Sequence, residues 1–321
     1  MKKVIAIVLA VMMLCAVTAC GGGDNGESAD TYTVGICQLV QNPALDAATQ
    51  GFKDVLTETF GDKVAFEEGN ASNDSAACAT ICNGFVSSGV DLILANATAS
   101  LQAAASATDS IPVLGTAVTE YGVALSIDNF DGTVGTNISG TSDLAPLDQQ
   151  ADMITELFPD AKNVGILYCS GEPNSKYQAK VVKECLEKKD LNVKVYTFAD
   201  TNDVSTVTSS ACDESDVIYI PTDNTAASCT EAINAVALPA GVPIIAGEEG
   251  ICKGCGVATL SIDYYELGRT TGQMAVKILK GEANVSEMPI EYYPEPVKKY
   301  NADLASKLNI TIPEGYTAIS D

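Results

Sequence analysis

The 321-residue sequence contains no histidine and no tryptophan. Without histidine, it has neither the serine–histidine nor the cysteine–histidine catalytic machinery, and it has no histidine metal site. Basic residues are also scarce: Arg269 is the sole arginine, and 18 lysines and arginines stand against 42 aspartates and glutamates. An acidic excess of this size argues against nucleic acid or an anionic lipid surface as a partner. We therefore expect no metal, no cofactor and no nucleic acid partner.

The N-terminus has the pattern of an export signal. Lys2 and Lys3 precede the apolar run Val4–Val17, which is too short for a membrane span and is typical of a secretory signal. The run ends in VTAC at residues 17–20, which resembles a bacterial lipobox and implies a lipidated Cys20. The alternative is an ordinary cleaved signal with a chance cysteine. With residues 1–20 as signal peptide and lipobox, and residues 21–31 as a polar tether, we expect a protein anchored by acyl chains at the extracytoplasmic face of the cell membrane.

Short β-branched runs alternate with amphipathic segments after the tether. We predict strands at 32–37, 64–68, 91–95 and 111–115, separated by helices at 45–60, 75–87 and 99–108. Strands alternating with helices of this length indicate right-handed βαβ units and a parallel sheet.

The same alternation of strands and helices repeats about 130 residues later, where KNVGILY at 162–168 is similar to YTVGIC at 32–37. DVIYIPTDNTAASCTE at 216–231 echoes DLILANATAS at 91–100, and VPIIAGEE at 242–249 echoes IPVLGTAV at 111–118. Self-similarity of this kind indicates an internal duplication of one open α/β lobe.

Two junctions repeat as well, at residues 137–157 and 259–279, and each reads as an extended segment followed by a helix of the other lobe. A third apolar segment, residues 288–293, precedes the terminal helix at 302–308. The predicted fold class is α/β, with two Rossmann-like open parallel-sheet lobes joined by a three-segment hinge. Residues 32–141 and 264–288 form the N-terminal lobe, and residues 142–263 and 289–321 form the C-terminal lobe.

Ligands of such sheets bind at the carboxyl ends of the strands, beside helix starts. The loops at those ends are rich in small polar and acidic residues. The candidate ligand-binding residues are Asn96, Thr98, Thr116, Ser142, Asp143, Asn174, Ser175, Thr222, Asp223, Asn224 and Glu248.

Four motifs carry a family resemblance: NPALD at 42–46, GTSDLAP at 140–146, PTDNT at 221–225 and IDYYELGR at 262–269. The chain resembles the substrate-binding lipoproteins of ABC importers in the tryptophan/tyrosine-binding group. This resemblance implies the type I periplasmic-binding-protein fold, an ABC permease as partner and an aromatic amino acid as ligand, either tryptophan, tyrosine or phenylalanine. It implies a binding protein and not an enzyme.

An α-amino acid fits the residues in these loops. Its carboxylate needs only the amides and hydroxyls at helix starts, such as that at Asn174 and Ser175. Its ammonium needs a buried carboxylate, for which Asp223 is the first choice and Glu248 the second. The alternatives are a helix cap for Asp223 and a solvated loop for Glu248. Apolar walls for an aromatic ring are available among Leu39, Val40, Tyr121 and Tyr264.

Other functions stay open at this point. A sugar or nucleoside is the alternative ligand, and a role beside a chemosensory receptor is indistinguishable from transport. From a different class, Cys252 and Cys255 form a C-x-x-C that a thiol oxidoreductase would use. We expect this pair to lie in a turn before a strand, as a structural disulfide or free thiols, and Cys78 and Cys82 to be buried on one helical face.

Overall fold

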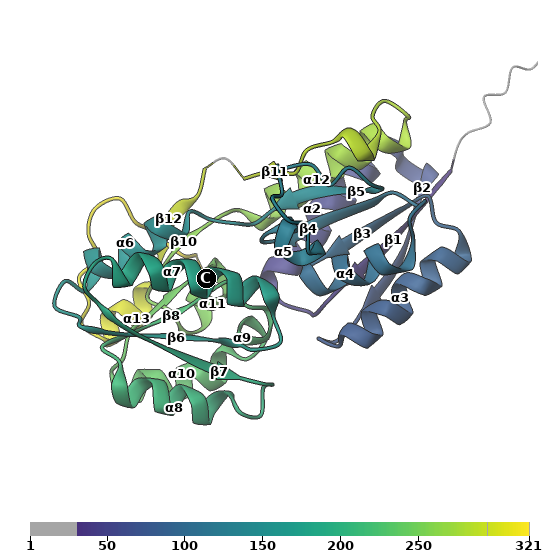
Figure 1. The fold of residues 1–321 in the computed structure, drawn as a ribbon. Coiled ribbons are helices and arrows are strands. Elements are labelled where there is room, and N and C mark those ends of the chain that lie inside the picture. Colours follow the sequence, from purple (N-terminus) through teal and green to yellow (C-terminus); the bar gives the residue numbers. More distant parts are fainter. Residues whose placement is uncertain (1–30, 294, 321) are drawn as a thin grey trace, which may run out of the picture. The chain divides into compact units, whose positions relative to one another are not determined.

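The computed structural model describes residues 31–293 and 295–320 (Figure 1). The predicted signal peptide, the lipobox with Cys20 and the tether up to residue 30 lie outside the described residues. None of the described helices is both long and apolar enough to cross a bilayer.

The first sheet has six strands in the order β11-β5-β4-β3-β1-β2, and all of its pairs are parallel. Its strands are β1 (Tyr32–Gln38), β2 (Val64–Asn70), β3 (Leu92–Asn96), β4 (Val113–Val118), β5 (Ile138–Ser142) and β11 (Glu291–Tyr292). The helices of this lobe are α2 (Pro43–Phe60), α3 (Ser75–Ser88), α4 (Thr98–Ala107), α5 (Tyr121–Leu125) and α12 (Tyr264–Leu279), with the 3-10 turns η1 (Gly61–Lys63) and η2 (Val285–Glu287).

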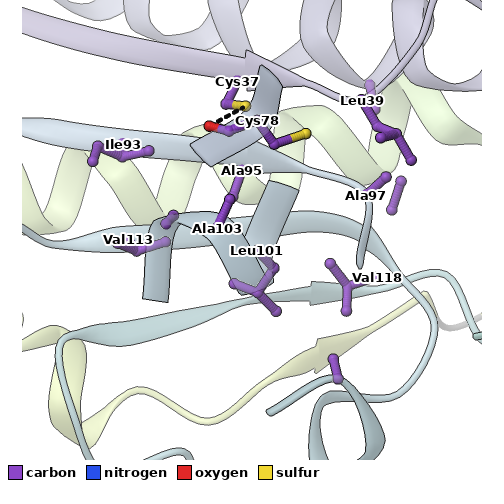
Figure 2. Close-up of a cluster of buried hydrophobic side chains, with 14 of the residues drawn as sticks. Cys37, Leu39, Cys78, Ile93, Ala95, Ala97, Leu101, Ala103, Val113 and Val118 are labelled. Atoms are coloured by element: carbon purple, nitrogen blue, oxygen red, sulfur yellow. Dashed lines mark hydrogen bonds between the residues drawn. The ribbon is translucent and has the colours of Figure 1, made fainter. Parts of the chain in front are cut away.

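Both faces of this sheet are covered, as the continuous apolar run of β3 requires. Side chains alternate along a strand, so Leu92 and Leu94 pack with α2 and α12, and Ile93 and Ala95 pack on the opposite face with α3 and α4. Figure 2 shows the second of these clusters, in which Cys37 and Cys78 lie together. Cys78 and Cys82 are fully buried free thiols, which confirms their prediction as small core side chains.

The second sheet has seven strands in the order β13-β12-β10-β9-β8-β6-β7, with one antiparallel pair, β10 and β12. Its strands are β6 (Asn163–Cys169), β7 (Asn192–Phe198), β8 (Val217–Ile220), β9 (Ile244–Ala246), β10 (Ala258–Ser261), β12 (Val297–Tyr300) and β13 (Thr317–Ala318). One face packs against α6 (Leu147–Leu157), α7 (Pro173–Glu187) and α13 (Ala302–Lys307). The other packs against α8 (Val204–Glu214), α9 (Asn224–Ser228), α10 (Thr230–Ala240) and α11 (Glu249–Cys255).

The predicted duplication is confirmed by the order of the strands. The run β2-β1-β3-β4-β5 of the first sheet corresponds, strand for strand, to the run β7-β6-β8-β9-β10 of the second. Each sequence echo falls on an equivalent pair: β1 with β6, β3 with β8, and β4 with β9. The carboxyl ends of equivalent strands therefore carry equivalent loops in the two lobes.

The chain crosses between the sheets three times. β5 leads into α6, β10 leads into α12, and β11 leads into β12. The third crossing differs from the prediction, which assigned residues 289–321 to the C-terminal lobe. Glu291 and Tyr292 pair with Thr141 and Ser142 of β5, so the chain leaves the first sheet only after β11.

Residues 249–255 form a helix, where a turn before a strand was predicted. The carboxylate of Glu248 explains the difference, since it accepts hydrogen bonds from the backbone N–H groups of Gly250 and Ile251 and so caps the first turn of α11. The C-x-x-C therefore lies on a short helix, with both of its cysteines buried.

Candidate ligand-binding site

A cavity lies where the carboxyl ends of both sheets meet the helix starts that follow them. Its free volume in this conformation is about 10 Å³, roughly the space of one water, so a small molecule fits only when the lining moves apart. Its lining comes from the start of α2, the end of β4, the first crossing and the starts of α7, α9, α11 and α12. The lining residues are Asn42, Ala44, Leu45, Ala117, Thr119, Asp143, Asn174, Thr222, Asp223, Asn224, Ala227, Glu248 and Tyr264.

Six of the predicted candidates line this cavity: Asp143, Asn174, Thr222, Asp223, Asn224 and Glu248. Whether they contact the ligand stays a prediction. The other five, Asn96, Thr98, Thr116, Ser142 and Ser175, are buried outside its lining.

The polar atoms of these five are largely used inside the lobes, and their contact with a ligand stays a prediction. Asn96 donates to the backbone oxygen of Leu45 and to Thr49, which ties β3 to α2. The Thr116 hydroxyl lies within hydrogen-bond distance of Thr141 and Thr271, Ser142 donates to the Thr119 oxygen, and Ser175 donates to the Thr222 oxygen. No side-chain hydrogen bond is found for Thr98 in the described part of the chain.

The wall from the N-terminal lobe is the start of α2, and its position follows from helix packing. A Cβ on Gly51 of α2 would lie 2.1 Å from the backbone oxygen of Tyr265 of α12, and one on Gly268 would lie 2.0 Å from that of Ala48. Glycine at both positions lets the two helices touch backbone to backbone. This contact brings the starts of α2 and α12 to the same end of the lobe, where Ala44 and Tyr264 line the cavity.

Asn42 caps α2, with its side-chain oxygen accepting from the N–H of Leu45 at 2.9 Å. Its amide nitrogen makes no hydrogen bond to any of the described residues, and the side chain is buried in the cavity wall. The amide nitrogen of Asn42 and the first-turn N–H of Ala44 are therefore hydrogen-bond donors available to the cavity, at the positive end of α2.

The wall from the C-terminal lobe is organised by Glu172, which was not among the residues predicted from the sequence. This buried carboxylate accepts hydrogen bonds from the side chains of Asn174, Asn224 and Thr225 and from the backbone N–H groups of Asn224 and Thr225. It fixes the first turns of α7 and α9 relative to each other. A glutamate immediately before Pro173, in the N-cap position of α7, was the available signal.

Three buried carboxylates line the cavity, and two of them have both oxygens occupied by backbone N–H groups. Asp223 accepts from Cys169 at 2.8 Å and from Ala226 at 2.7 Å. Glu248 accepts from Gly250 and Ile251. Burial raises the pKa of Asp223, with the nearby Glu172 adding to the effect, and burial raises the pKa of Glu248 to about 7. Both act as helix caps, which was the alternative considered for Asp223.

The third carboxylate, Asp143, is 4% exposed and lies in the first crossing. Its Oδ2 accepts a hydrogen bond of 2.9 Å from the hydroxyl of Tyr264, the first residue of α12. Its Oδ1 is buried and has no hydrogen-bond partner among the described residues. Burial raises the pKa of Asp143, while the nearby hydroxyls of Tyr264 and Thr119 act in the opposite direction.

The comparisons with known proteins agree with this architecture. The family model for ABC transporter substrate binding proteins matches residues 33–320. A tyrosine-binding protein from Clostridioides difficile strain R20291 is 33% identical over 325 residues, which cover 96% of this chain and 93% of that protein. The chain belongs to the ABC transporter substrate-binding proteins.

Two solved structures extend the match. The ABC domain in complex with L-Trp from Streptococcus pneumonia is 32% identical, with a TM-score of 0.85, over 90% of this chain and all 100% of that one. A substrate-binding protein with adhesive properties from Clostridium difficile, in a ligand-free, open structure, is 36% identical, with a TM-score of 0.69, over 90% and 99% of the two chains. The fold class predicted from the sequence, the type I periplasmic-binding-protein fold, is confirmed.

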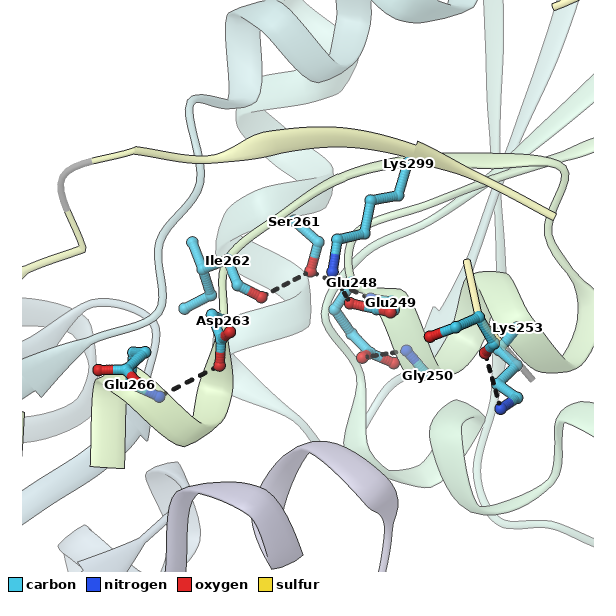
Figure 3. A network of polar contacts seen from close by, with 10 residues as sticks. Glu248, Glu249, Gly250, Lys253, Ser261, Ile262, Asp263, Glu266 and Lys299 are labelled. Carbon is cyan, nitrogen blue, oxygen red and sulfur yellow. Dashed lines mark hydrogen bonds and ion pairs between the residues drawn. The ribbon is translucent and has the colours of Figure 1, made fainter. Parts of the chain in front are cut away.

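A second cavity of about 400 Å³ adjoins the first in this substrate-binding protein and shares Ala44, Glu248 and Tyr264 with it. Figure 3 shows its polar network, in which Lys299 pairs with Glu249. Lys253 donates to the backbone oxygen of Ser320. Both lysines of this lining are therefore already engaged with other groups.

The C-x-x-C of the substrate-binding protein is unsuited to thiol exchange. Cys252 and Cys255 are free thiols, 0% and 4% exposed, and burial raises the pKa of both. Thiol exchange requires an accessible thiolate. Of the two states predicted for the pair, the structure has the free thiols.

Proposed function

We propose that this protein captures an aromatic amino acid (tryptophan, tyrosine or phenylalanine) outside the cell and delivers it to the permease of an ABC importer. The observation that carries the proposal is the cavity itself. Its lining comes from both lobes and includes a buried carboxylate with a free oxygen, and it belongs to a chain that is about one-third identical to proteins described with tyrosine or L-Trp.

In this proposal the ligand's carboxylate lies at the start of α2. The amide nitrogen of Asn42 and the N–H of Ala44 are the donors there, and the dipole of an 18-residue helix favours an anion at that end. This arrangement needs no arginine, which accords with a chain whose sole arginine, Arg269, pairs with Glu58 away from the cavity.

The aromatic ring of the ligand would lie against the apolar part of the lining. Leu45, Ala117, Ala227 and the ring of Tyr264 supply that surface. Tyr264 was among the predicted apolar walls. Leu39 and Val40 line a different cavity, and Tyr121 is a fully buried core residue whose hydroxyl bonds to the Thr141 oxygen.

Capture requires the lobes to separate and close about the three crossings. The described conformation supports closure, because the TM-score is 0.85 with the L-Trp complex but 0.69 with the ligand-free, open relative, at equal coverage of this chain. Cross-lobe hydrogen bonds from Asn73 to Thr225 and from Gln178 to Thr119 accord with a closed arrangement.

The localisation is part of the same proposal. The lipobox resemblance at residues 17–20 supports a lipid-anchored protein on the extracytoplasmic face, close to a membrane permease. A partnership with a chemosensory receptor would place the protein at the same face.

A thermal-shift screen over amino acids, nucleosides and sugars tests the proposal. At 100 times its Kd, a ligand stabilises the folded protein by about 2.7 kcal/mol, which is readily detected. We expect an L-aromatic amino acid to raise the Tm, with its D-enantiomer as the matched control. Stabilisation by a sugar or nucleoside, without any by amino acids, would assign the site to the alternative ligand class. Turnover of a disulfide substrate would instead support the oxidoreductase.

A further inference from the structure

We propose that Asp143 is the residue that binds the ligand's ammonium group, and that Tyr264 positions it. The inference rests on the proposed function and deepens it, because it makes the site selective for ligands that carry a cationic amine. Asp143 and Tyr264 lie on different crossings, the first after β5 and the second at the start of α12.

The hydrogen bonds single out one carboxylate of the three. Asp223 and Glu248 each accept two backbone N–H groups, one on each oxygen. Asp143 accepts the Tyr264 hydroxyl on Oδ2, the Thr119 hydroxyl lies nearby, and Oδ1 has no hydrogen-bond partner among the described residues. A buried carboxylate oxygen without a donor destabilises the protein, so its retention in a cavity wall indicates that a donor arrives with the ligand.

The described residues of the lining supply no cation for this group. The described lining of the cavity contains three carboxylates and no lysine or arginine. The cationic side chains of the adjoining cavity, Lys253 and Lys299, are bonded to the Ser320 oxygen and to Glu249. An ammonium group on the ligand would neutralise the charge of Asp143 and would also donate a hydrogen bond to Oδ1, since it carries a positive charge and three N–H donors.

Tyr264 fixes the direction in which Asp143 acts. Its hydroxyl holds Oδ2 at 2.9 Å, and the backbone N–H of Asp143 bonds to the oxygen of Val118. The carboxylate is thus held from α12 and from β4, which leaves Oδ1 for the ligand. The Asp143–Tyr264 bond also links the first and second crossings, so it lies where the lobes must move.

The test compares two variants and two ligands. We would measure the Kd of L-tyrosine and of 3-(4-hydroxyphenyl)propionate, which lacks only the amino group, by calorimetry. The wild type should strongly prefer L-tyrosine. Asp143→Asn should raise the Kd of L-tyrosine by at least about 30-fold, the loss expected when a buried charge pair loses one partner. It should change the Kd of the analogue by no more than about threefold.

Tyr264→Phe keeps the ring and removes the hydroxyl. This variant should raise the Kd of L-tyrosine by about three- to tenfold and leave the Kd of the analogue unchanged, whereas a purely structural role would raise both Kd values equally. If Asp143→Asn binds L-tyrosine as the wild type does, or loses both ligands in parallel, the assignment is overturned.

Stability without ligand provides a readout that does not depend on which ligand is bound. Asp143→Asn should be at least as stable as the wild type in urea, because it removes an unpartnered buried charge. A clear loss of stability would make Asp143 a structural residue and overturn the inference.

The ligand screen separates this inference from the proposed function. If another amine-bearing ligand binds, and its deaminated analogue binds far less well, the aromatic assignment fails and the role of Asp143 stands. If the only ligands that bind lack a cationic amine, the role of Asp143 fails.

Discussion

The side-chain amide of Asn73 donates to the hydroxyl oxygen of Thr225 at 3.0 Å, and this bond joins the two lobes. Thr225 has a single hydroxyl proton, which it donates to Glu172 at 2.7 Å, so it must accept from Asn73. Glu172 also holds the side chains of Asn174 and Asn224, both in the cavity wall. The cross-lobe bond is therefore part of the same network that shapes the cavity.

Removing this bond should shorten the lifetime of the closed complex. Asn73 has a positive φ of 66°, so Asn73→Gly is the suitable change, because glycine keeps that backbone conformation. We expect ligand dissociation to accelerate about two- to tenfold, the range for one hydrogen bond, with association little changed. Stopped-flow fluorescence would measure both rates.

Asn83→Ala is the matched control for that experiment. The Asn83 side chain is exposed on α3 and bonds only to its own helix, at the Ala79 oxygen. Asn83→Ala should leave the association and dissociation rates of the ligand unchanged. Equal dissociation rates in Asn73→Gly and the wild type would show that the bond does not hold the lobes together.

Asp223→Asn should destabilise the protein even without ligand. The aspartate accepts from Cys169 and Ala226 on separate oxygens, and an asparagine has one acceptor and would turn an amide against the other N–H. We expect the free energy of unfolding to fall by about 1–3 kcal/mol, measured by urea denaturation. A variant of normal stability that no longer binds amino acids would instead return Asp223 to the role first predicted for it.

The stability of the ligand-free protein should fall as the pH rises from 4.5 to about 7. The pKa of Glu248 is raised from 4.5 to about 7, mainly by burial, so the folded state holds this proton more tightly than the unfolded state. Its contribution is complete below pH 4.5 and is lost by pH 7, with an upper limit of about 3 kcal/mol. Urea denaturation across this range measures the slope.

Glu248→Gln tests the source of that slope. This variant should reduce the slope of stability against pH but not abolish it, because burial also raises the pKa of Asp143 and Asp223. An unchanged slope in Glu248→Gln would mean that this residue does not cause the effect.

The double change Cys252→Ala with Cys255→Ala should leave ligand affinity within a few-fold. Both thiols are on α11, buried in the core of the lobe and outside the cavity lining, and their raised pKa keeps them protonated. A thiol reagent should likewise not modify them in the folded wild type. Loss of binding in a folded double variant would revive a functional role for the pair.

Cys20→Ala should release the protein from the membrane fraction, as secreted or unprocessed chain, if Cys20 carries the acyl chains. Fractionation and mass measurement would show this. Undiminished membrane retention of a correctly cleaved variant would contradict the proposed anchor.

Much of the fold was predictable because it rests on local patterns. The continuous apolar runs at Val217–Ile220 and Leu92–Ala95 lie on strands β8 and β3, as predicted. The errors occur where a contact distant in sequence decides the structure. Glu291 and Tyr292 join the first sheet through pairing with β5, about 150 residues earlier, and nothing in residues 288–293 themselves specifies that partner.

The sequence by itself determined the two repeated lobes, the absence of histidine chemistry, and the polar loops at the carboxyl ends of the strands. Only the tertiary structure decided which polar groups are free. Asp143, Asp223 and Glu248 are all acidic residues in such loops, and the sequence favoured Asp223 and Glu248. Their difference lies in backbone N–H groups and in one hydroxyl, that of Tyr264, which is 121 residues from Asp143. A carboxylate is free for a ligand only after folding has assigned every other donor near it.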